Sequence, residues 1–225
     1  MEDSSIDTGR HHVSGPHQGQ PLVTAGTPLD EAEAAVVLVH GRGATARSIV
    51  RMAESFHHPG VAYLAPQASD NTWYPNPFTA PVESNEPGRT SGLRAIADAV
   101  GRATDAGIPT ERVMLLGFSQ GACLGSEFVA RDPTRYGGLA ALSGGLIGEA
   151  IDPDDYEGDL DRTPVFLGCS DVDPHIPEER VHASTDVFDR LNADVTTRLY
   201  PGMGHTINED EAERVSAMVA ALVAE

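Results

Sequence analysis

The sequence predicts an α/β fold in which a mainly parallel central sheet is covered by helices on both faces. Residues 34–39 form a continuous apolar run, which suits a central parallel strand buried on both faces. Further apolar runs alternate with segments of helical spacing as far as the C-terminus, and this alternation is typical of parallel sheets. At 225 residues, the chain is long enough to bury a large core without metals or disulfides.

The predicted elements follow in order from that first strand. The helix within residues 45–57 carries apolar residues at helical spacing, and Thr45 suits its N-cap because a hydroxyl satisfies a free backbone N–H. The helix within residues 88–106 ends at Gly107-Ile108-Pro109. The remaining predicted strands are 61–65, 113–116, 139–143, 165–169 and 195–200, and the remaining predicted helices are 122–131, 178–191 and 209–224.

The domain organisation follows from the same pattern. Residues 1–33 are polar and predict an N-terminal tail with one or two peripheral strands, whereas residues 34–225 predict a single α/β domain. The connection 66–90 is longer than a compact domain needs. Loops beyond the carboxyl ends of the strands form the ligand crevice of an open α/β sheet, so this connection is a candidate wall of a substrate pocket. The alternative is a well-packed surface loop.

The charge balance excludes several classes of partner. The chain has 34 acidic and 15 basic residues, a net charge of −19, and every basic residue is an arginine. We expect no nucleic-acid partner, because phosphate binding needs basic clusters, and no membrane insertion, because no apolar run is long enough. The acidic N-terminus and the two cysteines, Cys123 and Cys169, favour a cytoplasmic protein. The acidity suggests a halophilic source, with an ordinary acidic, arginine-biased bacterial protein as the alternative.

A serine lies at a sharp turn between a predicted strand and a predicted helix. The pentapeptide Gly117-Phe118-Ser119-Gln120-Gly121 follows the apolar run 113–116 and precedes the helical segment. Glycines flank the serine because a side chain there would collide with the neighbouring strand or helix. The free N–H groups at the helix N-terminus point toward the hydroxyl, where they stabilise developing negative charge. The pentapeptide also occurs in ordinary loops, but the flanking strand and helix favour a nucleophile.

Candidate partners of the serine follow later strands. A serine hydroxyl is a weak nucleophile and needs a histidine base, which a carboxylate must orient. In sites of this kind the acid precedes the histidine along the chain, and each lies in the loop after a strand. His205 follows the last predicted strand, and Asp171 and Asp173 follow the strand 165–169. Local chemistry leaves both aspartates open as the acid.

Other residues of the site are predicted with less support from spacing. One oxyanion donor is expected from the loop His40-Gly41-Arg42-Gly43, for which an ordinary glycine-rich turn is the alternative. The second donor is expected to be the backbone N–H of Gln120, the residue after the serine. Trp73 and Phe78 are predicted to contact the substrate, with a packing role as the alternative for each. No set of His, Cys and Asp shows metal-ligand spacing, so no metal is expected.

With these residues identified, the chain resembles the phospholipase/carboxylesterase family of α/β hydrolases. The resemblance extends from about Ala34 to the C-terminus. It rests on Val39 to Gly43, Leu64 to Ala68 with Trp73 following, Gly117 to Ala122, Leu142 to Gly144, Asp173 to Pro177, and Gly204-His205.

The resemblance implies an α/β-hydrolase fold without a large cap, hydrolysis of short acyl esters or thioesters, and no cofactor. It selects Asp173 as the acid and assigns the oxyanion donors to the backbone N–H groups of Arg42 and Gln120. Arg42 stands where many relatives have an apolar residue, so its guanidinium is a candidate for the pocket mouth and leaves the substrate open.

The predicted function is therefore a serine hydrolase that cleaves short carboxylic esters through an acyl-enzyme. The alternatives are hydrolysis of thioesters, lactones or aromatic esters, a cofactor-free perhydrolase-like activity, and a ligand-binding homologue without turnover. The expected partner is a small-molecule ester, and a homodimer is left open.

Overall fold

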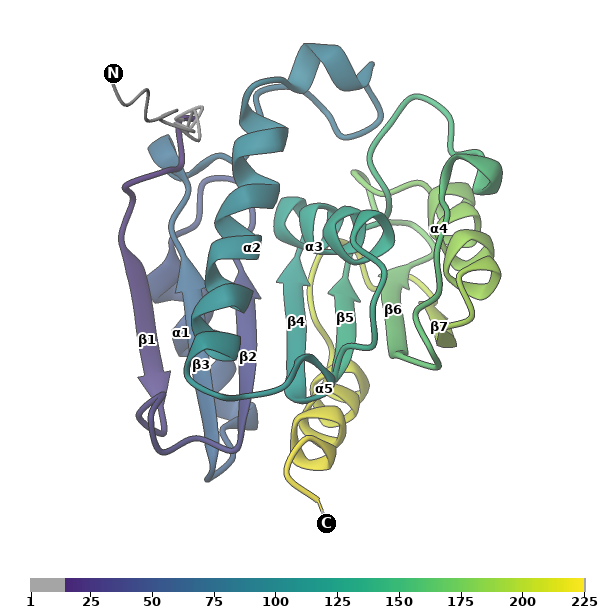
Figure 1. The fold of residues 1–225 in the computed structure, drawn as a ribbon. Helices are drawn as coiled ribbons and strands as arrows, with labels where there is room; N and C mark the ends of the chain where they lie inside the picture. The colour runs from purple at the N-terminus through teal and green to yellow at the C-terminus, as the bar shows by residue number, and fades with distance from the viewer. Residues whose placement is uncertain (1–14, 225) are drawn as a thin grey trace, which may run out of the picture.

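The computed structural model describes residues 15–224, in which seven strands form one twisted sheet (Figure 1). The strands are β1 (Leu22–Gly26), β2 (Ala34–Val39), β3 (Val61–Pro66), β4 (Val113–Phe118), β5 (Gly138–Leu142), β6 (Pro164–Ser170) and β7 (Asp194–Tyr200). Their order across the sheet is β1-β3-β2-β4-β5-β6-β7. Edge strand β1 pairs antiparallel with β3, and every other pair is parallel, which confirms the predicted mainly parallel sheet.

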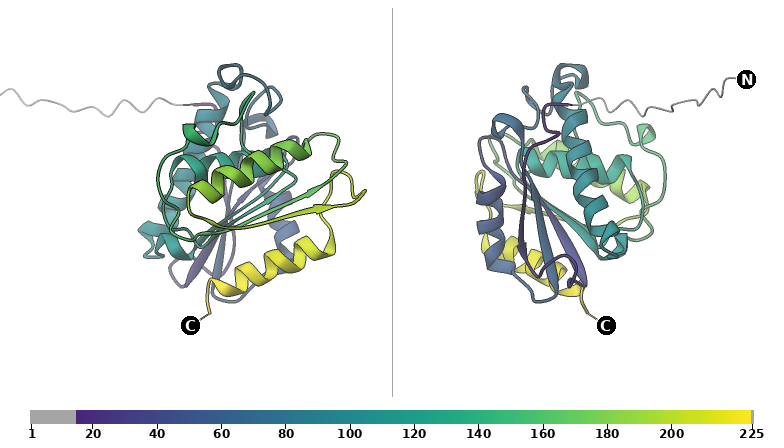
Figure 2. Two further views of the ribbon diagram at one scale, coloured as in Figure 1. Left: turned by 90° about the vertical axis from the view of Figure 1, so that its right-hand side faces the viewer. Right: turned by 60° about the vertical axis from the view of Figure 1, so that its left-hand side comes forward.

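Helices cover both faces of the sheet, as predicted. They are α1 (Ala46–Ala53), α2 (Gly88–Asp105), α3 (Gln120–Arg131), α4 (Glu178–Arg190) and α5 (Glu209–Ala221). Figure 2 shows the sheet between two helical layers, with α2, α3 and α4 on one face and α1 and α5 on the other. Each layer has its own apolar cluster, because alternate residues of the buried strands point to opposite faces.

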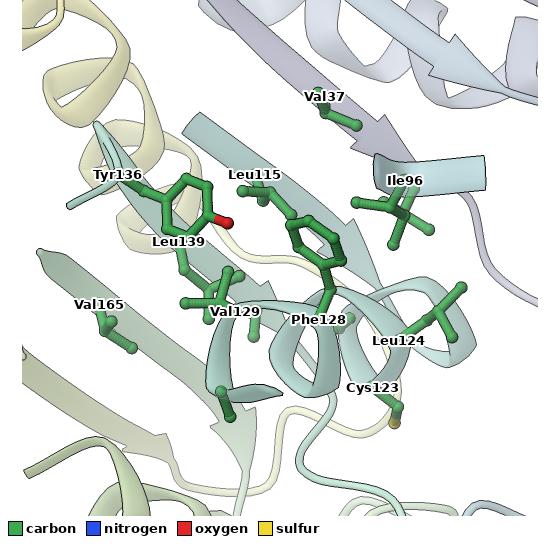
Figure 3. Close-up of a cluster of buried hydrophobic side chains, with 14 of the residues drawn as sticks. Val37, Ile96, Leu115, Cys123, Leu124, Phe128, Val129, Tyr136, Leu139 and Val165 are labelled. Atoms are coloured by element: carbon green, nitrogen blue, oxygen red, sulfur yellow. The ribbon is translucent and has the colours of Figure 1, made fainter. Parts of the chain in front are cut away.

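The larger apolar cluster lies beneath α2 and α3. In Figure 3, strand side chains meet the inner faces of these two helices, and all of the labelled residues are buried. The labelled side chains are Val37, Leu115, Leu139 and Val165 of the strands, Ile96 of α2, Cys123, Leu124, Phe128 and Val129 of α3, and Tyr136 of the loop before β5. This packing fixes the first turn of α3 against the centre of the sheet.

The element bounds differ from the predicted bounds mainly at helix ends. Thr45 caps α1, and its hydroxyl accepts a hydrogen bond from the Ser48 N–H, but α1 ends at Ala53 and a 3-10 turn follows. Helix α5 also stops earlier than the predicted residue 224, at Ala221. The first 14 residues of the predicted tail lie outside the described part of the chain.

The loops that matter for function emerge at one edge of the sheet. Because β2, β4, β5, β6 and β7 are successive parallel strands, their carboxyl ends lie together, at the top of the sheet in Figure 1. The long connection between β3 and α2, residues 67–87, crosses above this edge and contains two short 3-10 turns. Of the helices within residues 15–224, none combines the length and the apolar character needed to cross a bilayer.

Candidate active site

Ser119 occupies a strained turn between β4 and α3. Its φ is 55° and its ψ is −121°, a conformation that glycine adopts easily and serine rarely does. A Cβ at Gly117 would collide with the backbone of Gly121, and a Cβ at Gly121 would collide with the carbonyl of Val39. The glycines on both sides of Ser119 are therefore required by close backbone packing, which holds the hydroxyl at the start of α3.

The structure brings Ser119, His205 and Asp173 together from three separate loops. The Oγ of Ser119 lies 2.9 Å from Nε2 of His205, and Nδ1 of His205 lies 2.7 Å from Oδ2 of Asp173. The three residues follow β4, β7 and β6, respectively. This is the order of contacts that a base-activated serine needs, with the carboxylate on the far side of the imidazole.

The geometry distinguishes the two candidate aspartates. Oδ1 of Asp173 accepts hydrogen bonds from the N–H groups of His175 and Ile176, at 2.8 and 3.1 Å, while Oδ2 faces His205. Burial alone would raise the pKa of Asp173, but these hydrogen bonds outweigh it and hold the pKa below its usual value. Asp171 is exposed and accepts a hydrogen bond from the N–H of Gly202 at 2.8 Å, so it braces the turn after β7.

The backbone N–H groups of Arg42 and Gln120 are the predicted oxyanion donors. Gln120 is the first residue of α3, so its N–H has no partner within the helix. Arg42 follows Gly41, where a Cβ would lie 3.3 Å from the carbonyl oxygen of Phe118 and 3.4 Å from Cβ of Ser119. Within residues 15–224, neither the Arg42 nor the Gln120 N–H donates to another backbone group outside regular elements.

A cavity of about 440 Å³ opens beside the serine. Its lining is largely apolar and includes no acidic side chain, in a chain whose net charge is −19. The lining residues are Arg42, Tyr74, Pro75, Pro77, Phe78, Ser119, Gln120, Cys123, His175, Ile176 and His205. The connection 66–90 thus supplies one wall of the cavity, as the sequence suggested.

The two aromatic residues predicted to contact the substrate, Phe78 and Trp73, occupy different positions in the structure. Phe78 lines the cavity, where its carbonyl accepts a hydrogen bond from Gly148 N–H at 2.8 Å and its ring lies 5.2 Å from the guanidinium carbon of Arg180. For Trp73, the structure favours the packing role that was the alternative to substrate contact. Its side chain is fully buried outside the cavity lining, and its indole N–H donates to the carbonyl of His40 at 2.8 Å. Trp73 therefore supports the cavity wall from behind.

Sequence reasoning missed six residues of the lining, namely Tyr74, Pro75, Pro77, Cys123, His175 and Ile176. Tyr74 and Cys123 are buried, and His175 presents its ring edge-on to His205 at a centroid distance of 4.9 Å. Ile176, the next residue after His175, also lines the cavity. The signal that could have identified these residues is proximity in the sequence, because each lies one to four positions from a predicted site residue. Within residues 15–224, no group of three or more His, Cys, Asp or Glu side chains is arranged to hold a metal ion.

A buried carboxylate secures the loop that carries His205. Glu211 is fully buried at the start of α5, where its Oε2 accepts a hydrogen bond from Asn208 N–H at 2.9 Å and its Oε1 has no partner. Asn208 in turn caps the helix by accepting from Glu211 N–H at 2.8 Å. Burial raises the pKa of Glu211 to about 7. The loop 205–208 is thus fixed to α5 by a group that titrates near neutral pH.

This pKa predicts how stability depends on pH. A carboxyl whose pKa is raised by folding stabilises the protein below its unfolded-state pKa, and this contribution is lost as pH rises toward 7, by at most ~1.4 kcal/mol per pH unit. We expect Glu211→Gln, which keeps the capping geometry, to flatten the decline in unfolding free energy between pH 5 and pH 8. Urea titrations at each pH measure the unfolding free energy of each protein and so its dependence on pH. Glu209→Gln, in the same helical turn but exposed, should keep the wild-type slope; equal slopes for all three proteins would contradict the assignment.

Comparisons with known proteins place the chain among characterised families. A family model described as Phospholipase/Carboxylesterase matches residues 23–223. The chain is similar to Acyl-protein thioesterase 1 of Gibberella zeae, with 32% identity over 120 residues, covering 51% of this chain and 50% of the relative. It is also similar to Acyl-protein thioesterase 1 of Saccharomyces cerevisiae, with 29% identity over 147 residues, covering 64% of this chain and 63% of the relative. The matches thus span about half to three-fifths of these relatives.

A solved structure extends the similarity to nearly the whole fold. The phospholipase/carboxylesterase from Dyadobacter fermentans has a TM-score of 0.86 and 40% sequence identity, and the match covers 89% of this chain and 96% of that one. The resemblance identified from the sequence motifs is therefore confirmed, as is the α/β-hydrolase fold. The chain belongs to the phospholipase/carboxylesterase family.

Proposed function

We propose that this protein is a serine hydrolase that cleaves short acyl esters through an acyl-enzyme intermediate. The observation that carries the proposal is the hydrogen-bonded series from Ser119 through His205 to Asp173 at the mouth of a largely apolar cavity. Membership of a family that contains carboxylesterases and acyl-protein thioesterases supports the same reaction class. The cavity suits a small-molecule ester whose acyl or alcohol group is apolar.

In the proposed reaction, the Oγ of Ser119 attacks the ester carbonyl carbon while Nε2 of His205 takes the hydroxyl proton. Asp173 holds Nδ1 protonated and stabilises the imidazolium that forms. The backbone N–H groups of Arg42 and Gln120 donate to the oxyanion, which expels the alkoxide as His205 returns the proton to it. A water molecule, deprotonated by His205, then releases the carboxylic acid and restores Ser119.

Thioesters are the second candidate substrate class. The curated relatives that match this chain are named acyl-protein thioesterases, and their reaction would use the same nucleophile, base and oxyanion donors. Because a thiolate is a better leaving group than an alkoxide, a site built for acyl transfer accepts both when the cavity fits the acyl chain. A cytoplasmic location and a halophilic source stay predictions from the sequence, and a homodimer is left open.

Two measurements test the proposed function. We expect a fluorophosphonate probe to label the folded protein once, on Ser119, and the urea-unfolded protein not at all, because labelling requires the activated hydroxyl. Peptide mass spectrometry locates the label. A panel of 4-nitrophenyl esters and matched thioesters from two to twelve carbons should show turnover, with the highest kcat/KM at short chain length. Labelling without turnover would indicate a ligand-binding homologue, and neither labelling nor turnover would refute the proposal.

A further inference from the structure

The side chains of the two residues proposed as oxyanion donors converge on one carbonyl. Nη2 of Arg42 donates to the carbonyl oxygen of Tyr74 at 2.8 Å, and Nε2 of Gln120 donates to the same oxygen at 2.8 Å. Arg42 lies in the loop after β2, and Gln120 begins α3 after β4. Two loops that are far apart in the sequence are therefore joined through the backbone of a third.

The same two side chains hold the residues on either side of that carbonyl. Oε1 of Gln120 accepts a hydrogen bond from the N–H of Trp73 at 2.9 Å. The Arg42 guanidinium also donates to Pro75 at 3.1 Å and to Asn76 at 3.0 Å, so that it contacts three successive carbonyls. We call residues 73–76 the clamped segment, because five hydrogen bonds from these two side chains hold it.

The sequence of the clamped segment keeps it out of helices and sheets, so its carbonyls need hydrogen-bond donors from elsewhere. Pro75 lies within it and Pro77 follows it, and proline has no N–H to offer a neighbouring strand or turn. Its carbonyls belong to no helix or sheet. Arginine suits this role because its planar fork reaches several acceptors at once, and charge-assisted hydrogen bonds are stronger than neutral ones.

The two side chains hold the segment from different environments, because Gln120 is buried whereas Arg42 is exposed. Gln120 is 6% exposed, so losing either partner of its side-chain amide would leave a buried polar atom unsatisfied. Trp73 adds a third connection, because its buried indole donates to His40, two residues before Arg42. Among residues 15–224, Arg42 forms no ion pair, so its guanidinium hydrogen bonds go to backbone carbonyls.

We infer that Arg42 and Gln120 act twice: their backbone N–H groups bind the oxyanion, and their side chains act as positioning groups that lock both loops to the clamped segment. The inference rests on the proposed function, since it takes those N–H groups as the oxyanion donors. It also gives Arg42 a role other than binding the substrate at the pocket mouth. Oxyanion stabilisation requires donors fixed before the reaction, so loosening the clamp should slow acylation more than it weakens substrate binding.

The experiment is a double-mutant cycle with Arg42→Met, Gln120→Met and the double variant. Deleting one oxyanion donor lowers kcat by about 10²–10³-fold, and a displaced donor should lose part of that, so we expect each single variant to lose ~10-fold in kcat. KM should stay within about twofold of wild type. Because both side chains act through one segment, the double variant should lose much less than the ~100-fold product of the two single losses.

Two further variants distinguish the effect of the Arg42 hydrogen bonds from the effect of its positive charge and from the effect of replacing any surface arginine. Arg42→Lys keeps the positive charge but not the planar fork, so it should show most of the loss seen in Arg42→Met. Arg47→Met, an exposed arginine in the first turn of α1, should match wild type in every assay. Wild-type kcat in Arg42→Lys, or additive losses in the cycle, would overturn the inference.

A second readout is independent of catalysis. Trp73 is the only tryptophan in the chain and belongs to the clamped segment, so its fluorescence reports on that segment alone. We expect stronger acrylamide quenching in Arg42→Met and Gln120→Met than in wild type or Arg47→Met, in protein that circular dichroism shows to be folded. Unchanged quenching in both clamp variants would also overturn the inference. If wild-type protein hydrolyses no ester, the proposed function fails, and Trp73 quenching still decides whether these side chains hold the segment.

Discussion

Replacing Ser119 with alanine should reduce kcat/KM for 4-nitrophenyl butyrate by at least ~10⁴-fold, because the acyl-enzyme can no longer form. The variant keeps the fold, since alanine retains Cβ and Ser119 Oγ caps no helix. The residual rate should equal hydrolysis assisted by the remaining oxyanion donors alone. Initial rates at 405 nm, corrected for spontaneous hydrolysis, measure the loss, and fluorophosphonate labelling should disappear with it.

Ser55→Ala is the matched control for this variant. Ser55 is exposed beyond the end of α1, and its hydroxyl donates only to the nearby carbonyl of Met52. We expect wild-type kinetics and labelling from this control. A Ser119→Ala protein that retained a comparable rate would show that another group attacks the ester and that the assignment of the nucleophile is wrong.

Asp173→Asn should lower kcat by ~10³–10⁴-fold, the second largest effect that we expect. Asparagine has nearly the same shape, but its amide is neutral and presents an N–H₂ group to Nδ1 of His205. The imidazole is then held in the wrong tautomer, and its positive charge in the transition state has no counter-ion. Because the pKa of Asp173 lies below its usual value, the wild-type carboxylate is ionised throughout the neutral range in which the assay is run.

Asp171→Asn provides an internal comparison two residues away. Asp171 accepts a hydrogen bond from Gly202 N–H, and an asparagine oxygen can accept it equally well. An exposed substitution of this kind changes stability by about 0.5 kcal/mol or less, so kcat should stay within about threefold of wild type. Similar losses in the two variants would mean that the loop as a whole, and not the carboxylate of Asp173, supports His205.

The sequence predicted the sheet and its helices well because both are encoded locally. A strand such as β2 is buried on both faces, so every residue from Ala34 to Val39 must be apolar, and that pattern is visible without any knowledge of neighbours. Helix ends were less accurate. Helix α1 changes to a 3-10 turn after Ala53, where packing and not intrinsic preference sets the end of the helix.

The candidate site was predictable to the extent that its residues follow strand ends. Parallel neighbours place their carboxyl ends together, so residues after β4, β6 and β7 were expected to meet although they are far apart in sequence. Spacing could not distinguish Asp171 from Asp173, because both lie in the same short loop. Only the resemblance favoured Asp173, and in the structure it is Asp173 whose Oδ2 lies 2.7 Å from His205.

The sequence by itself determined the α/β architecture, the position of Ser119 in a strained turn and the chain order of its predicted partners, since these depend on apolar periodicity and on glycines beside the turn. Tertiary structure alone decided that Phe78 lines the cavity while Trp73 lies buried behind it, and that Arg42 contacts the backbone of residues 74–76. The physical reason is that a side chain in an irregular loop has no repeating direction, so the packing of distant segments determines where it points.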